Sequence, residues 1–167
     1  MDLRTLLLRS RRSALQRWVL NMALRWNVPF NRPHGFYVHP QNDGTIRVKV
    51  PYWPINRNHI RGIHACALAT AAELSSGLSL LQHLDPKEYR LIMRSIHMEY
   101  HFQAKRTAFA ESRIDETLIG TLRDRINAEG STDHSSNVIV KNDKGEHLAT
   151  GTIVWQLKAW SKVRTKV

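Results

Sequence analysis

Cysteine is almost absent from the sequence, since Cys66 is the only one among 167 residues, and an internal disulfide is therefore excluded. Long hydrophobic runs are absent too: no stretch of about 18 uncharged apolar residues occurs, which predicts that no segment spans a membrane. The first residues also lack the apolar core and small-residue cleavage site of a secretory signal. We expect a cytoplasmic protein, because a reducing compartment suits a lone thiol.

Acidic residues are scarce as well. Asp and Glu number 14 against 25 Lys and Arg, which gives a net charge of +11 and an isoelectric point near 10.4. This excess of positive charge indicates an anionic partner. Such a partner would be nucleic acid, a membrane surface or a phosphorylated small molecule such as coenzyme A. No base-recognition motif is present and the aromatic residues are spread along the chain, so we expect no nucleic acid partner.

The length suits one domain, which we assign to residues 1–167. Its first part, 1–27, has apolar residues at helical spacing with arginines around them, which predicts a basic amphipathic helix. Such a helix would suit peripheral contact with a membrane. The core follows at 28–160 and a basic tail at 161–167.

The sequence of the core predicts one buried helix and several strands. The segment 65–81 is apolar in every direction apart from Glu73, which predicts a helix buried on all sides. Alternating patterns and an Asn-Asp-Lys-Gly turn signal predict antiparallel strands around it. The predicted strands are 45–51, 92–102, 107–114, 137–141 and 147–159, with a short helix at 116–128. We therefore predict an α+β fold in which one antiparallel sheet wraps a long central helix.

The segment Asn58–Cys66 carries the most specific pattern of the chain. It resembles the signature of the hot-dog thioesterases, in particular the branch typified by the phenylacetate-pathway enzyme: Asn-x-x-Gly-x-x-His-Gly-Gly, then an acid nine residues after the His. Asn58, His64 and Glu73 match these positions. Arg61 stands where the family has its first Gly, with Gly62 one place late, and Ala65-Cys66 replaces the Gly-Gly pair. The resemblance, to a bacterial subgroup of this superfamily, covers about residues 25 to 160.

The resemblance implies the hot-dog fold, with the N-terminal helix as an addition, and hydrolysis of acyl-coenzyme A or a related thioester without a cofactor. Glu73 would act as general base toward a water or attack directly, and Asn58 would orient the water or the thioester. His64 would position the carbonyl or hold the loop.

Several neighbours in the sequence complete the expected substrate site. The free N–H of Ala65 at the helix start would stabilise the oxyanion, with Gly62 beside it in the loop. The guanidinium groups of Arg57 and Arg61 would grip the phosphates of coenzyme A.

Helix geometry adds a constraint of its own. His64 and Glu73 are nine residues apart, which on a helix is roughly 180° around the axis and about 13 Å along it. One pocket of one chain does not easily hold both. We expect a two-fold homodimer, which two copies would extend to a dimer of dimers, with Glu73 meeting Asn58 and His64 of a second copy.

Simpler interpretations stay open for each of these residues. Glu73 would be a buried acid satisfied by backbone or by an arginine, His64 a helix cap, and Asn58 an ordinary turn residue. Cys66 is better explained as a small buried residue than as a nucleophile, because His64 is poorly placed to activate it. No HExxH pattern or cysteine pair supports a zinc site.

Two other functions stay open beside the thioesterase. One is a catalytically silent hot-dog protein that binds an acyl or aromatic ligand in the same pocket. The other is a basic module that binds membranes or nucleic acid.

Overall fold

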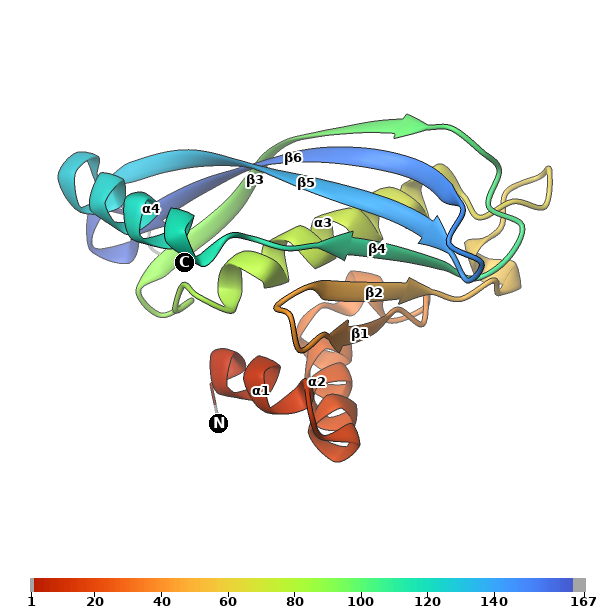
Figure 1. Ribbon diagram of the computed structural model, residues 1–167, viewed down its shortest axis with the longest axis horizontal. Coiled ribbons are helices and arrows are strands. Elements are labelled where there is room, and N and C mark those ends of the chain that lie inside the picture. Colours follow the sequence, from red (N-terminus) through yellow and green to blue (C-terminus); the bar gives the residue numbers. More distant parts are fainter. Residues whose placement is uncertain (1, 164–167) are drawn as a thin grey trace.

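A curved antiparallel sheet wraps around a long helix in the computed structural model, which describes residues 2–163 (Figure 1). The helices are α1 (Leu3–Ser10), α2 (Ala14–Asn27), α3 (Ala65–Leu81) and α4 (Glu116–Glu129), with short 3-10 turns η1 (Pro29–Asn31), η2 (Pro54–Asn56) and η3 (Trp160–Lys162). The strands are β1 (Tyr37–Pro40), β2 (Ile46–Val50), β3 (Tyr89–Tyr100), β4 (Ala108–Ser112), β5 (Ser131–Asn142) and β6 (His147–Ala159). Of the predicted basic tail, residues 164–167 lie outside this range.

The six strands are ordered β1-β2-β4-β5-β6-β3, and every neighbouring pair is antiparallel. Strands β5, β6 and β3 are more than twice as long as the others and form the curved part of the sheet over α3. Strands β1 and β3 are the two edges. This is the predicted α+β arrangement of the hot-dog fold, with α3 where the sequence predicted the central helix.

Helix α3 satisfies its own polar groups, which lets it lie against the sheet. The hydroxyl groups of Ser75, Ser76 and Ser79 each donate to the backbone carbonyl three residues earlier. The indole N–H of Trp155 on β6 donates to the Ser76 hydroxyl at 3.0 Å. A Cβ at Gly77 would lie 3.1 Å from the Trp155 ring, so glycine lets helix and strand approach closely here.

The prediction that α3 is buried all round is wrong for one stripe of the helix. Cys66 is exposed, and Thr70, Glu73 and Leu74 are only partly covered. The sheet covers one side of the helix, while this stripe faces away from it. The prediction that Cys66 is a buried small residue is therefore also wrong.

The N-terminal segment forms two helices rather than the single helix predicted for 1–27. The chain turns at Arg11–Ser13, and Ser13 caps α2 by accepting a hydrogen bond from the Gln16 N–H. Asn21 then binds α2 to the edge of the sheet, because its side chain both accepts from the Val38 N–H and donates to the Val38 carbonyl of β1. None of the helices within residues 2–163 is long and apolar enough to span a membrane.

Candidate functional site

The loop before α3 is organised around Asn58. The Asn58 side-chain oxygen accepts hydrogen bonds from the Gly62 N–H at 2.9 Å and the Ile60 N–H at 3.2 Å, and the Asn58 N–H donates to the Gly62 carbonyl at 2.8 Å. The oxygen of the carboxamide thus braces the loop, as in the ordinary turn interpretation. Its NH2 group donates to no other group within residues 2–163, so it is available to a ligand.

Arg61 has a φ of 60°, the only positive φ at a non-glycine position within residues 2–163. The hot-dog signature has glycine here, and glycine adopts this conformation without a steric penalty. Two hydrogen bonds hold the residue in place: its N–H donates to the Asn58 carbonyl at 3.0 Å, and the Tyr52 hydroxyl donates to its carbonyl. The loop therefore keeps its shape despite the substitution, while the Arg61 side chain is exposed.

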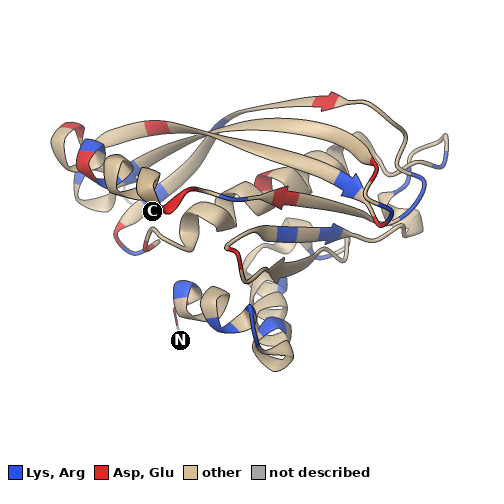
Figure 2. Cartoon of the chain, viewed as in Figure 1, with Lys and Arg blue, Asp and Glu red and all other residues tan. Residues whose placement is uncertain are grey.

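The other two predicted substrate residues of the loop differ in exposure. Gly62 is buried, and a Cβ there would lie 2.7 Å from the Gln103 side chain, which in turn donates to the Ile60 carbonyl at 2.9 Å. Arg57 is exposed, with its guanidinium 5.1 Å from the centre of the Tyr52 ring. Within the described chain neither Arg57 nor Arg61 forms an ion pair, so both charges face solvent. Figure 2 shows positive charge both around this loop and on the N-terminal helices.

His64 caps α3. Its Nδ1 accepts a hydrogen bond from the Cys66 N–H at 3.1 Å, so the neutral ring carries its proton on Nε2. The backbone N–H of His64 donates to the carbonyl of the buried Asn56 at 2.7 Å, which fixes His64 to the η2 turn. The capping interpretation of His64 is confirmed, and it leaves an exposed Nε2–H free to donate to a ligand.

The first N–H groups of α3 are unequally available. The Cys66 N–H is taken by His64, whereas the Ala65 N–H finds no acceptor among the described residues. Tyr100, at the end of β3, donates to the Ala65 carbonyl at 3.0 Å, and burial raises the pKa of its phenol. Tyr100 is not among the predicted site residues, although the alternation of side chains along β3 places it on the strand face toward α3. A single backbone donor, that of Ala65, is thus available at the helix start.

Glu73 lies more than two turns along α3 and is half-buried. Burial raises the pKa of its carboxyl above the ordinary value of 4.5. This carboxylate forms no hydrogen bond or ion pair within residues 2–163. The described residues therefore do not support the interpretation of Glu73 as a buried acid satisfied by backbone or by an arginine. An unpaired carboxylate in such surroundings is a stronger base than one exposed to water.

A cavity of about 720 Å³ adjoins Glu73 and is lined almost entirely by apolar side chains. Its walls come from α1, α2 and η1 on one side and from α3 and β6 on the other, and include Leu6, Ala23, Leu24, Leu78 and Trp155. Among the residues of 2–163 that line it, Glu73 is the only ionisable one. The sequence does not predict this cavity, because the apolar stripe of the N-terminal helices indicates that they are buried but not which element they pack against.

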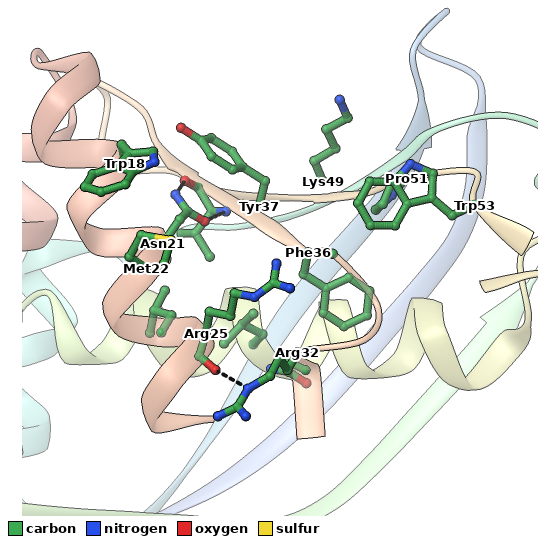
Figure 3. Close-up of a pocket in the computed structure, with 15 residues that line it drawn as sticks. Trp18, Asn21, Met22, Arg25, Arg32, Phe36, Tyr37, Lys49, Pro51 and Trp53 are labelled. Atoms are coloured by element: carbon green, nitrogen blue, oxygen red, sulfur yellow. Dashed lines mark hydrogen bonds between the residues drawn. The ribbon is translucent and has the colours of Figure 1, made fainter. Parts of the chain in front are cut away.

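A second cavity of about 520 Å³ lies on the other side of α2 (Figure 3). Its lining is aromatic and cationic, with no acid among the described residues, and includes Trp18, Arg25, Arg32, Phe36, Tyr37, Lys49 and Trp53. The two cavities share Leu24, Asn31 and Leu74, so they are neighbours. Neither is lined by Asn58 or His64.

The structure therefore brings the predicted residues together in two groups. Arg57, Asn58, Arg61, His64 and Ala65 gather at the start of α3, and Glu73 lies about 13 Å further along the helix axis. No group of three or more His, Cys, Asp or Glu side chains within residues 2–163 is arranged to hold a metal ion.

Comparison with known proteins agrees with this architecture. The family described as "Domain of unknown function (DUF4442)" matches residues 16–157. A solved structure of a protein of unknown function from Pseudomonas aeruginosa, described as a probable thioesterase, is 26% identical with a TM-score of 0.77, over 84% of this chain and 94% of that one. No curated protein matches the chain.

Two more distant solved structures have the same fold. A variant of a second P. aeruginosa thioesterase is 12% identical with a TM-score of 0.68, over 90% of this chain and 99% of that one. A thioesterase from Haemophilus influenzae is 8% identical with a TM-score of 0.69, over 87% and 92%. The hot-dog fold and the likeness to hot-dog thioesterases are confirmed, while the phenylacetate branch stays a prediction.

Proposed function

The chain belongs to the family of the domain of unknown function DUF4442, and we propose that it hydrolyses acyl thioesters, with acyl-coenzyme A or a related thioester as substrate. The observation that carries the proposal is Glu73, an unpaired, half-buried carboxylate beside an apolar cavity, in a fold that named thioesterases share. Burial of an unpaired carboxylate lowers the stability of the fold. Such groups gather at functional sites, where a raised pKa makes the carboxylate a better base.

In the proposed reaction Glu73 accepts a proton from a water molecule, whose oxygen attacks the thioester carbonyl. The Ala65 N–H and the His64 Nε2–H donate to the oxyanion that develops, and the Asn58 NH2 group orients the water or the thioester. The carbon–sulfur bond then breaks, and the thiol leaves with the proton that Glu73 returns. Arg57 and Arg61 contact the thiol carrier, with their guanidinium groups on its phosphates. Gly62, whose N–H and carbonyl are both hydrogen-bonded to Asn58, holds the loop that carries them in shape.

We further propose that each site combines two subunits, Glu73 from one and Asn58 with His64 from the other. The separation of the two groups along α3 supports this arrangement. So does strand β3, which is an edge of the sheet with Ile92 and Met93 exposed at 45% and 37%. An exposed edge strand of twelve residues is a template for pairing with a second copy.

Release of free thiol from a panel of acyl thioesters tests the hydrolysis. We expect turnover by the wild-type protein and a fall of about 10²- to 10⁴-fold in kcat for Glu73→Gln, with KM little changed. The matched control Glu116→Gln, at an exposed position of α4, should retain wild-type kcat. No turnover of any thioester, or full turnover by Glu73→Gln, would refute the proposal.

One observation favours a catalytically silent protein instead. The His64 cap occupies the Cys66 N–H, which leaves the Ala65 N–H as the single backbone donor at the helix start. An oxyanion hole usually joins two or more donors, and loss of one lowers kcat by roughly 10²- to 10³-fold. Saturable binding of the same thioesters without thiol release would favour this second function.

A different observation favours membrane contact by the N-terminal helices. Leu15, Trp18 and Trp26 are exposed at 67%, 57% and 65% on a segment rich in arginine. Exposed aromatic and basic side chains together suit the surface of an anionic bilayer. Sedimentation with anionic vesicles at moderate salt tests this contact, and its absence would exclude both the membrane contact and the alternative of a basic membrane-binding module.

A further inference from the structure

The apolar cavity beside Glu73 is built by parts of the chain that the thioesterase motif does not include. Leu3 and Leu6 of α1 and Ala23 and Leu24 of α2 form one wall, and Leu78 and Leu81 of α3 form the facing wall. Trp155 belongs to the lining as well, and its position is fixed by the hydrogen bond to Ser76. The N-terminal helices therefore convert one side of α3 into a pocket within a single subunit.

We propose that this cavity receives the acyl chain of the substrate, and that the substrate is a long-chain acyl thioester of about eight carbons or more. This assignment rests on the proposed thioesterase function. Glu73 lies in the wall of the cavity. An acyl chain whose alkyl tail fills the cavity therefore keeps its thioester carbonyl near the Glu73 carboxylate. The anionic carrier then stays outside, where the arginines of the loop lie.

The size of the cavity sets the expected chain length. A methylene takes up roughly the 30 Å³ of a water molecule in the liquid, so a cavity of 720 Å³ that is only half-filled holds roughly twelve carbons. An acetyl group would leave most of the leucine side chains without contacts. Each additional buried methylene should therefore raise kcat/KM about threefold to fourfold until the cavity is filled.

The neighbouring cavity is excluded as the acyl site by its charge. Arg25, Arg32 and Lys49 line it together with aromatic rings (Figure 3), and none of the three forms an ion pair within residues 2–163. An alkyl chain placed there would displace water from these cations without offering a hydrogen bond. The apolar cavity carries a smaller penalty, because Glu73 is the one ionisable residue among the described residues that line it.

Ala23 gives a way to shorten the cavity without touching the thioesterase motif. Its methyl group lies in the wall that α2 contributes, so Ala23→Phe would fill part of the volume. Ala128→Phe makes the same change at an exposed position of α4 and serves as the matched control. Circular dichroism and thermal unfolding check that both variants fold.

The experiment measures kcat/KM for acetyl-, butyryl-, octanoyl-, dodecanoyl- and palmitoyl-coenzyme A with the wild-type protein and both variants. A fluorescent fatty acid is titrated in parallel as a readout that does not require turnover. We expect kcat/KM to rise about 80- to 250-fold over the four methylenes from butyryl to octanoyl. Ala23→Phe should lower the values for the long chains about tenfold or more, with little change for butyryl, which is too short to reach the filled part. Ala128→Phe should match the wild type.

The outcomes separate the two proposals. Turnover that is highest for acetyl or butyryl and insensitive to Ala23→Phe would overturn the assignment while the thioesterase function stands. Absence of turnover together with fatty-acid binding that Ala23→Phe weakens would support the cavity and refute the hydrolysis. Absence of saturable fatty-acid binding would overturn the assignment, as expected if a second copy of the chain fills the cavity.

Discussion

The two groups of candidate residues on α3 are held by different kinds of contact. At the start of the helix Asn58, Arg61 and His64 are fixed by hydrogen bonds to residues at most nine positions away in the sequence. Glu73 instead lies beside apolar side chains from α1, α2 and β6, which are far from it in the sequence. In the proposed enzyme the loop would therefore set the geometry of the donors, whereas the cavity would set the pKa of the Glu73 carboxyl and the length of the acyl chain that fits.

This contrast is sharpest in the pH dependence of activity. Glu73 must be deprotonated to act as a base, and burial raises its pKa above 4.5. We predict that kcat/KM falls about tenfold per pH unit below that raised pKa and is constant just above it. Glu116→Gln should leave the profile unchanged, whereas an acidic limb that persists in Glu73→Gln would assign the titration to another group.

The loop should respond mainly in stability. Asn58→Ala removes the acceptor for two backbone N–H groups and is expected to lower the free energy of unfolding by about 1–2 kcal/mol. Asn58→Asp keeps the acceptor oxygens and removes the NH2 donor, so it should unfold like the wild type yet lose activity. Chemical denaturation and thiol release measure the two effects. Equal stability of the wild type and Asn58→Ala would contradict the bracing role of this side chain.

Restoring the glycine of the hot-dog signature gives the smallest expected effect. Arg61→Gly relieves the positive φ, which costs a non-glycine residue about 1–2 kcal/mol, but it increases the entropy of the unfolded chain. We predict a net gain of about 0.5–1 kcal/mol in the free energy of unfolding. Arg125→Gly, the same change within α4, should instead lose about 1 kcal/mol. A loss at both positions would show that Arg61 is not strained.

Much of the fold was predictable because its signals are local. The limits of α3 and β6 agree with the sequence to the residue, since an apolar run and an Asn-Asp-Lys-Gly turn define them. The missed strand β1 has only four residues and ends at Pro40, so alternation could not identify it. The break at Arg11–Ser13 carries no glycine or proline, and only the Ser13 cap marks it.

The candidate site was predictable in part for the same reason. The spacing of Asn58, His64 and Glu73 is a property of the sequence, and so is the His64 cap. The exposure of Cys66 and the cavity beside Glu73 depend on where the N-terminal helices pack, which no periodicity specifies. Long-range packing, rather than the motif, decides what lies next to the carboxylate.

The composite site is tested most directly by activity in mixed dimers. Glu73→Gln and Asn58→Ala subunits are co-expressed with different tags and purified as heterodimers. If each site joins Glu73 of one subunit to Asn58 of the other, one of two sites is intact and the heterodimer has roughly half the wild-type activity. Wild type paired with a subunit that carries both changes should then be inactive. An inactive first heterodimer and a half-active second one would contradict the account.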